Sequence, residues 1–436
     1  MTISCSYIHA TMKDIFQKCF DYQDAKFVKA SGFYPFFKPI AHSKGSTVFY
    51  NGSPVVMIGS NNYLGLTHDP RVIQKAKEAI EIFGTGCTGS RFLNGNTVLH
   101  DHLEEKLADF VGKEETLVFT TGFLTNLGTI ACLVGPDDII LSDAENHASI
   151  IEGCRLSKAT VITYRHNDMQ DLEKKLREIP KESGCFIVTD GVFSMTGDIV
   201  RLPELVSVKK RFPKARLFID DAHGLGVLGP KGEGTAAHFG LAEEVDLIMG
   251  TFSKSFASIG GFLAGQPDVI DYVRHRARSF MFSAAMPPAS VATVLACLEI
   301  LKEEPQRLEQ LKKNLKKILD GFEKIGLAYI PSETPIVSVF VGDEGKAFRF
   351  VQELFNNGIF ATPVVYPAVP FGQALIRTSY MATHTEKELE QVLRVFGKLA
   401  PQFGILKSQL EVPTELTHKT QSYSWHETPG TLQKCL

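Results

Sequence analysis

The sequence predicts an α/β fold built on a mostly parallel sheet, followed by a smaller C-terminal α+β domain. Three observations predict this class. Six short apolar runs lie between residues 116 and 250, helical patterns alternate with them, and a proline pair at 287–288 precedes a second helix-and-strand unit. Runs that are apolar on both faces are typical of strands covered by helices on each side. Alternation of strand and helix indicates an α/β domain.

The first two predicted segments are an N-terminal arm and the large domain. Residues 1–55 form the arm, because aromatic residues and prolines cluster in "SGFYPFFKPI" without a sustained period. Residues 56–290 form the large domain. Its helices include "LHDHLEEKLADFV", with leucines at helical spacing, and "LPELVSVKKRF", with a proline near its start. Its strands are "TLVFTT" (116–121), "DIILSD" (138–143), "TVITYR" (160–165), "CFIVTD" (185–190), "RLFIDD" (216–221) and "VDLIMG" (245–250).

The rest of the chain predicts a smaller domain and a tail. "PQRLEQLKKNLKKILDGFEKIG" has the pattern of a long amphipathic helix, and "PIVSVFVGD" and "IRTSYM" are expected strands of a domain over residues 291–402. Residues 403–436 are polar and are expected to form a loosely held tail.

Composition excludes several classes of protein. The 44% hydrophobic and 22% charged residues are typical of a globular protein, and the net charge of −3 gives no basic stripe for nucleic acid. The eight cysteines form no C-x-x-C pair, which predicts neither a zinc site nor a disulfide framework and fits a reduced cytoplasm. No window reaches the ~18 apolar residues of a spanning helix. Peripheral contact with a membrane stays open.

Chemically unusual residues follow four of the predicted strands. In an open parallel sheet, ligands bind beyond the carboxyl ends of the strands. Gly122 and Phe123 open a helix-like segment whose N–H groups attract a phosphate. The other three strand ends are followed by His147, by Asp220 and His223, and by Thr251, Ser253 and Lys254. Each residue alone fits an ordinary loop or turn, but their joint occurrence predicts a site.

The lysine in "GTFSKSFASIGGF" suggests the chemistry of that site. Lys254 has no acidic residue within ten positions on its C-terminal side. Burial lowers the pKa of a lysine from ~10.4 and frees its amine for covalent bonding to an aldehyde. We therefore expect pyridoxal phosphate as cofactor, with Asp220 at the pyridine nitrogen and His223 at the ring hydroxyl.

Four motifs, "GTFSKSFASIGG", "DDAHGLGVLG", "NNYLGL" and "GCTGSRFLNGN", together resemble the α-oxoamine synthases. These are fold-type I, aspartate aminotransferase-like pyridoxal phosphate enzymes that join an amino acid to an acyl-CoA with loss of carbon dioxide. The likeness runs from about residue 30 to 400 in one order. It implies that Lys254 binds the cofactor and moves the α-proton, and that the chain forms a homodimer with the active site at the interface.

The resemblance also assigns roles to individual positions. His147 is expected to stack on the cofactor ring, and Ser194 to lie near it. No metal is expected, and Arg377 could alternatively serve a salt bridge between domains. The resemblance implies that the phosphate is held by Thr251, Ser253, the backbone of Gly122 and Phe123, and Ser283 of the neighbouring subunit, and that Asn61 or Asn62 and Arg377 face the substrate carboxylate.

Within that family, "GTGCTGSRFLNG", "ARSFMFSA" and "SYMATHT" favour the branch that condenses L-serine with palmitoyl-CoA to 3-oxosphinganine, the first step of sphingolipid synthesis. The apolar "TPVVYPAVP" fits a long acyl chain. Two other branches stay open: glycine C-acetyltransferases, which "YPAVPFGQALIRT" resembles, and 8-amino-7-oxononanoate synthases, whose second arginine is replaced here by Val365. A transaminase and a non-catalytic partner subunit are further alternatives. Lys254, Asp220, His147 and His223 argue against the latter.

Overall fold

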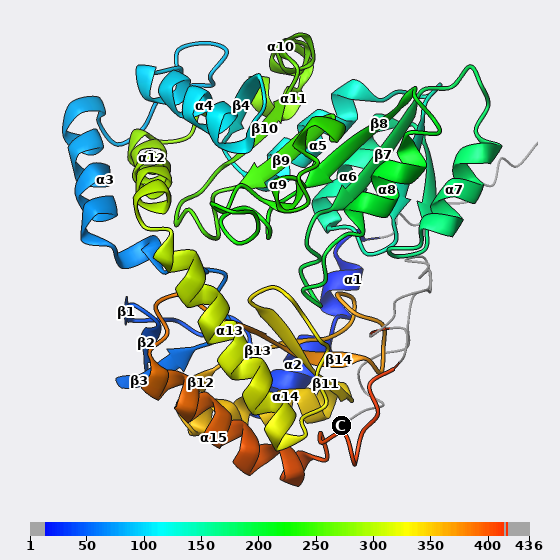
Figure 1. Cartoon of the computed structure of the whole chain (residues 1–436). Helices are drawn as coiled ribbons and strands as arrows, with labels where there is room; N and C mark the ends of the chain where they lie inside the picture. The colour runs from blue at the N-terminus through cyan, green and yellow to red at the C-terminus, as the bar shows by residue number, and fades with distance from the viewer. Residues whose placement is uncertain (1–13, 414–415, 417–436) are drawn as a thin grey trace, which may run out of the picture.

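The computed structural model describes residues 14–413 and Leu416, and its largest unit is built on a seven-stranded sheet (Figure 1). Only β10 runs antiparallel to its neighbours in that sheet. The strand order is β4 (Glu115–Phe119), β10 (Gly261–Gly265), β9 (Leu247–Thr251), β8 (Ala215–Asp220), β7 (Cys185–Asp190), β5 (Ile139–Asp143) and β6 (Thr160–Tyr164).

All six predicted strands occur, with ends within two residues of the predicted ones. Sequence reasoning missed β10, because glycines in "GGF" are depleted from strands and indicated a turn. In the structure, these two glycines are required by close backbone packing and by an unusual backbone conformation. A Cβ on Gly261 would lie 2.8 Å from Cα of Gly122, and Gly260 has a φ of +123° that disfavours other residues.

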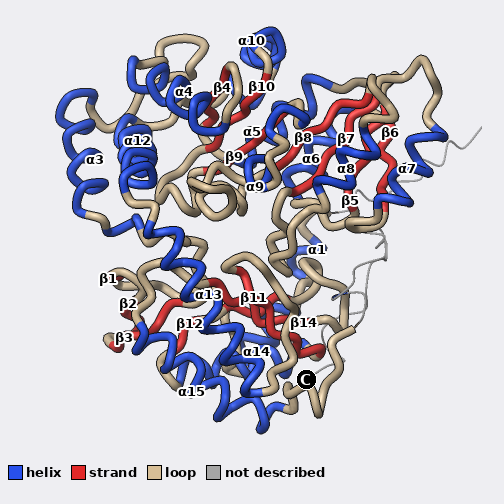
Figure 2. Tube along the Cα trace, viewed as in Figure 1, coloured by secondary structure: helices blue, strands red, loops and turns tan. Residues whose placement is uncertain are grey.

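Helices cover both faces of this sheet, as Figure 2 shows. Side chains alternate between two apolar clusters along each strand. On β8, Leu217 and Ile219 join one cluster and Phe218 joins the other. The first cluster packs under α4 (Val98–Val111), α7 (Met169–Glu178), α8 (Leu202–Lys209) and α12 (Pro288–Glu303), beside α3 (Pro70–Phe83); the second packs under α5 (Gly122–Leu133), α6 (Ala148–Ser157), α10 (Pro267–Arg276) and α11 (Arg278–Met281).

The C-terminal unit is a three-stranded antiparallel sheet with long helices packed on it. Its core is a separate apolar cluster that includes Phe322, Phe350 and Phe396. Thr385 caps the last helix, where its hydroxyl and the Glu388 carboxylate form a capping box. The strands are β11 (Ile336–Gly342), β14 (Ala374–Ser379) and β13 (Thr362–Val364), and the helices are α13 (Gln306–Ile325), α14 (Glu344–Asn356) and α15 (Glu386–Phe403).

The segment predicted as an arm contributes strands to this C-terminal unit. β1 (His42–Lys44), β2 (Thr47–Tyr50) and β3 (Ser53–Met57) form a sheet with β12 (Ile359–Phe360), which pairs in parallel with β3. The predicted boundary at residue 55 therefore falls inside a strand. Two short helices precede them, α1 (Gln17–Phe20) and α2 (Asp24–Ala30).

The predicted α/β class, with a large mostly parallel sheet and a smaller C-terminal unit, is confirmed. Most of the predicted polar tail lies outside the described residues, which include only 403–413 and Leu416 of it. Within the described part of the chain, no helix has both the length and the apolar character needed to cross a membrane.

Candidate active site

The predicted site residues of the large unit gather at the carboxyl edge of its sheet. Asp220 is the last residue of β8, and Lys254 follows the end of β9 by three residues. Gly122 begins α5 after β4, and His147 is the N-cap of α6 after β5. The hydrogen-bonded register of the strands brings these loops together, as expected for a parallel sheet.

Lys254 is half-buried, and its amine interacts with several charged groups of the site. Burial lowers its pKa to about 8, although the carboxylates of Asp220 and Asp190 act in the opposite direction. The sequence suggested an amine remote from acids, since none is near along the chain. The fold corrects this: two carboxylates at the ends of neighbouring strands lie close in space.

A chain of hydrogen bonds joins Asp220 to His147. Asn126 Nδ2 donates to Asp220 Oδ2 at 2.6 Å and to Ser149 Oγ at 2.7 Å. Nδ1 of His147 accepts from the Ser149 backbone N–H at 3.2 Å, and Ser149 Oγ lies 2.7 Å from the same nitrogen. Nδ1 is therefore unprotonated, and burial lowers the pKa of His147 in agreement. The ring is neutral, with its proton on Nε2.

A second network joins His223 to Arg377, far apart in sequence. The hydroxyl of Tyr63 lies 2.6 Å from His223 Nδ1 and 3.5 Å from Arg377 Nη2. Arg377 Nη2 also donates to Asn61 Oδ1 at 2.9 Å, and its Nε donates to the Ser194 carbonyl at 2.6 Å. Burial lowers the pKa of His223 well below its usual range and raises that of Tyr63. The C-terminal unit thus contributes a fixed guanidinium to the site.

The start of α5 lies against the end of β9. A Cβ on Gly122 would lie 2.8 Å from Thr251 Oγ1, so this glycine allows the helix N-terminus to approach that hydroxyl. Thr251 Oγ1 also lies 3.1 Å from Ser253 Oγ. Thr251 Oγ1 donates to the Gly260 carbonyl at 3.1 Å, and rotation of this hydroxyl would add it to the N–H groups of the helix start and to Ser253 as donors for an anion such as a phosphate.

Three further predicted residues lie in different surroundings. Asn62 Nδ2 donates to Thr67 rather than to Arg377, so Asn61 is the asparagine at the guanidinium. Ser194, which was expected to lie near the cofactor ring, contacts Arg377 through its backbone carbonyl. Ser283 follows α11 and is half-buried, and among the described residues no hydrogen bond joins it to the cluster.

Sequence reasoning assigned no role to three groups of the site. Asp190 accepts the backbone N–H of His147 at 2.8 Å, and burial beside Asp220 raises its pKa well above the usual range. Its position at the end of "CFIVTD" was a usable signal. Tyr63, within "NNYLGL", and Asn126, within α5, gave no signal, because only tertiary contacts reveal their partners.

The donor set fits the expected pyridoxal phosphate. The fit rests on one amine with a lowered pKa, a carboxylate oriented by Asn126, and an anion-binding helix start, all at one sheet edge. The amine suits the aldehyde of the cofactor, the carboxylate suits its pyridine nitrogen, and the helix start suits its phosphate. The phosphate would lie at Gly122, Phe123, Thr251 and Ser253.

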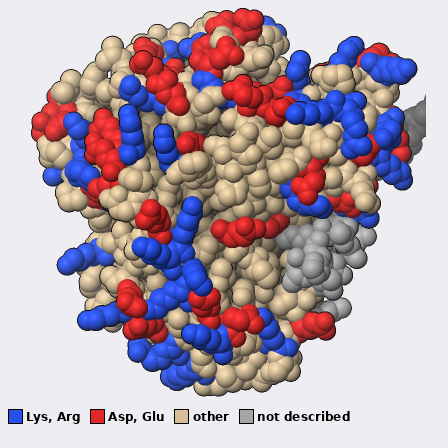
Figure 3. Space-filling model, viewed as in Figure 1, with Lys and Arg blue, Asp and Glu red and all other residues tan. Residues whose placement is uncertain are grey.

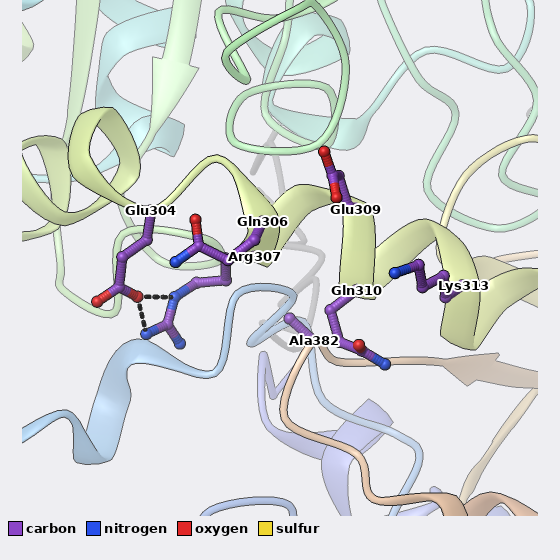
Figure 4. Close-up of a pocket in the computed structure, with 7 residues that line it drawn as sticks. All are labelled: Glu304, Gln306, Arg307, Glu309, Gln310, Lys313 and Ala382. Atoms are coloured by element: carbon purple, nitrogen blue, oxygen red, sulfur yellow. Dashed lines mark hydrogen bonds and ion pairs between the residues drawn. The ribbon is translucent and has the colours of Figure 1, made fainter.

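The pocket drawn in Figure 4 belongs to another part of the molecule. It lies at the start of α13 and is lined mainly by polar and charged side chains, including Arg307, which pairs with Glu304 at 2.6 Å, and by Ala382. None of the predicted site residues lines it. On the face drawn in Figure 3, basic and acidic side chains are interspersed over both units, without one large basic surface.

Comparisons with known proteins agree with this geometry. The family model for aminotransferases of class I and II matches residues 53–396. A serine palmitoyltransferase from Bacteriovorax stolpii is 51% identical over 382 residues, covering 87% of this chain and 91% of the relative. An 8-amino-7-oxononanoate synthase from Thermoanaerobacter pseudethanolicus is 42% identical over 380 residues, covering 87% and 96%.

A solved structure extends the likeness to the fold. A serine palmitoyltransferase variant from S. paucimobilis, with a bound PLP–myriocin aldimine, superposes with a TM-score of 0.87 at 34% identity. The match covers 90% of this chain and 100% of the other. The predicted fold-type I class is confirmed.

Proposed function

Because the chain belongs to the aminotransferase class I and II family, we propose that it is a pyridoxal phosphate-dependent acyltransferase. It condenses L-serine with palmitoyl-CoA and releases CoA, carbon dioxide and 3-oxosphinganine. One observation carries the proposal: an amine whose pKa burial lowers to about 8 interacts electrostatically with the Asp220 carboxylate at the sheet edge and with the guanidinium of Arg377, which Asn61 holds. The 51% identity to a serine palmitoyltransferase supports the same activity.

The large unit holds the cofactor and moves protons. Bound pyridoxal phosphate supplies an aldehyde for an incoming amine and a ring that accepts electrons from the substrate's α-carbon. Lys254 Nζ would hold the cofactor and would accept the α-proton of the substrate, since its lowered pKa leaves part of it uncharged near neutrality. Asp220 would keep the ring nitrogen protonated, His223 would bind the ring oxygen, and His147 would cover one ring face.

Arg377 binds the carboxylate of L-serine. A planar guanidinium matches a carboxylate through two parallel hydrogen bonds, which a lysine cannot make. Asn61 and the Ser194 carbonyl hold this guanidinium in place at 2.9 Å and 2.6 Å. Tyr63 links it to His223, so substrate and cofactor ring share one hydrogen-bonded frame.

The acyl group is a long alkyl chain. Val365 stands where relatives that use a pimeloyl thioester carry a second arginine, and it packs half-buried against the apolar core of the C-terminal unit. A dicarboxylate tail would have no cationic partner at this position, whereas an alkyl chain gains ~0.8 kcal/mol per buried CH₂. The second candidate, 8-amino-7-oxononanoate synthase, is favoured by the 42% identity to such an enzyme.

The proposal includes a homodimer whose site is completed by Ser283 of the neighbouring subunit. Beside that serine, the apolar side chain of Phe282 is 74% exposed. A neighbouring subunit that reaches Ser283 would also cover this side chain.

We also place the protein in the cytoplasm, in peripheral contact with the inner face of the membrane. Around α1, Phe16 and Phe20 are more than half exposed beside Lys18. Aromatic side chains next to a basic residue suit the lipid–water boundary, where a long-chain acyl-CoA partitions.

The experiment is a survey of substrates with the purified protein. We would supply L-serine, glycine or L-alanine with thioesters from acetyl-CoA to palmitoyl-CoA and measure CoA release, with Lys254→Ala as the inactive control. The expected preference is L-serine with palmitoyl-CoA. Preference for glycine with acetyl-CoA, or for a pimeloyl thioester, would assign one of the other branches. A keto acid product without CoA release would indicate a transaminase.

A further inference from the structure

A buried histidine lies between two loops that carry site residues. His166 follows β6, and its side chain is 1% exposed. Its Nδ1 lies 2.9 Å from Asp143 Oδ1, and its Nε2 lies 2.8 Å from Asp198 Oδ2. Both ring nitrogens are thus within hydrogen-bond distance of a carboxylate oxygen, and the imidazole bridges the two side chains.

The first carboxylate, that of Asp143, contacts the loop that carries His147. Asp143 ends β5, and its Oδ1 accepts the backbone N–H of Glu145 at 2.9 Å. Its Oδ2 accepts the backbone N–H of Asn167 at 2.9 Å. His147 lies only two residues beyond Glu145. The contact between His166 and Asp143 therefore ties the start of this loop to β6.

The second carboxylate, that of Asp198, belongs to the hairpin whose Ser194 carbonyl contacts Arg377. Residues 192–199 form a tight hairpin, in which Val192 and Ile199 pair and the Phe193 N–H donates to the Asp198 carbonyl at 3.0 Å. His166 reaches both arms of this hairpin. It pairs with Asp198 and meets the Phe193 ring edge-on, with centroids 4.3 Å apart. The next residue after Phe193 is Ser194, whose carbonyl accepts from Arg377 Nε.

We propose that His166 is a positioning residue that couples the loop of His147 to the hairpin holding Arg377, through the sequence of contacts Asp143–His166–Asp198. The inference rests on the proposed function and adds residues to which neither the sequence motifs nor the cofactor chemistry assigns a role. Loss of the imidazole leaves two carboxylates facing each other across the gap. The hairpin keeps its contacts with Asn167, at 3.2 Å to both Asp198 Oδ2 and the Ile199 carbonyl, but it loses the contact that joins it to Asp143. The Ser194 carbonyl then holds the guanidinium less firmly.

The test compares two variants with a matched control. His166→Gln removes the imidazole that bridges the two carboxylates, and Asp198→Asn weakens one contact at a side chain that is 22% exposed, which makes misfolding less of a concern. His102→Gln changes an exposed histidine of α4 that also lies near a carboxylate, at 3.6 Å from Glu105. We expect the KM for L-serine to rise about tenfold in both test variants, with kcat changed by less than about threefold, because a distant residue acts here through the geometry of the binding group. The control should match the unchanged enzyme.

A second readout is independent of turnover. Backbone hydrogen exchange in peptides covering residues 143–150 and 191–200 should accelerate in both test variants, while exchange in α13 stays unchanged. If KM and exchange in both loops stay unchanged in a folded His166→Gln, the coupling is wrong. If His166→Gln does not fold, Asp198→Asn decides in the same way.

One rival explanation gives a different result. Glu145 Oε2 lies 4.0 Å from His166 Nε2, and Glu145, His166 and Asp198 together have ligand atoms close enough to hold a metal ion. If EDTA raises the KM of the unchanged enzyme and Mn²⁺ or Zn²⁺ restores it, a metal ion rather than direct hydrogen bonds links the loops, and our inference is overturned. If the unchanged enzyme releases no CoA with L-serine, the proposed function fails, and hydrogen exchange still decides the coupling.

Discussion

The two sides of the candidate site are held in place by different means. On the cofactor side, the residues follow the ends of strands in one sheet, and backbone pairing fixes their spacing: Asp190 lies opposite Asp220, and Asp220 lies opposite Met249. On the substrate side, Arg377 belongs to another unit, and its side chain reaches Asn61, Tyr63 and the Ser194 carbonyl through hydrogen bonds between the units. The positions of the cofactor-side residues are fixed by the sheet, whereas the position of Arg377 depends on how the two units pack.

This difference separates two kinds of defect. A change on the cofactor side alters the chemical step, because the reacting groups are already fixed by the sheet. A change on the substrate side alters the affinity for the amino acid and leaves cofactor binding intact. The following predictions test that separation, beginning with the largest effect.

Lys254→Ala should abolish turnover. The variant loses both the covalent bond to the cofactor and the base at the α-carbon, so kcat should fall at least about 10³-fold. CoA release measures the loss, and borohydride treatment should no longer fix the cofactor to this position. Turnover within tenfold of the unchanged enzyme would contradict the assignment of this amine.

Asp220→Asn should lower kcat about 10²-fold with little change in the KM for L-serine, because an amide no longer favours a protonated ring nitrogen. The side chain keeps its size, and its one oxygen still accepts from either Asn126 or the Ala222 backbone N–H, so the fold should persist. Circular dichroism and cofactor absorbance check that the site is still loaded. A rise in KM without loss of kcat would place Asp220 on the substrate side instead.

Arg377→Lys should act in the opposite way. Loss of the paired hydrogen bonds between the guanidinium and the substrate carboxylate should raise the KM for L-serine about 10- to 100-fold. This matches a hydrogen bond to a charged group worth about 1.5–3 kcal/mol. Cofactor affinity, measured by absorbance titration, should stay unchanged. Weakened cofactor binding would show that the two sides are not separable.

Lys254→Met should stabilise the cofactor-free protein at low pH. The pKa of Lys254 is lowered to about 8, so between that pH and the ordinary value near 10.5 the unfolded chain binds more protons than the folded one. The cost of Lys254 is therefore fully present below pH 8 and disappears above pH 10.5. We expect the variant to gain about 1–2 kcal/mol in free energy of unfolding at pH 7.5, allowing for the partial exposure of this side chain. Urea unfolding at several pH values measures the gain, and a constant difference across this range would contradict a lowered pKa.

The sequence was most informative where a predicted strand is followed directly by a residue of the site. Apolar runs bounded by Gly122, His147, Asp220 and Lys254 predicted both the strands and the site at their ends, because strand register carries those residues to one edge. It was least informative for β10, whose glycines indicated a turn. Those glycines permit a backbone approach that no single-sequence pattern displays.

By itself, the sequence determined the large sheet, the amine and carboxylate at its edge, and the kind of cofactor they fit. Tertiary structure alone decided that Asp190 approaches Lys254, that Tyr63 bridges His223 and Arg377, and that His166 lies between two carboxylates. The physical reason is that periodicity reports which face of an element is buried, whereas hydrogen bonds between side chains distant in sequence form only when separate elements pack together.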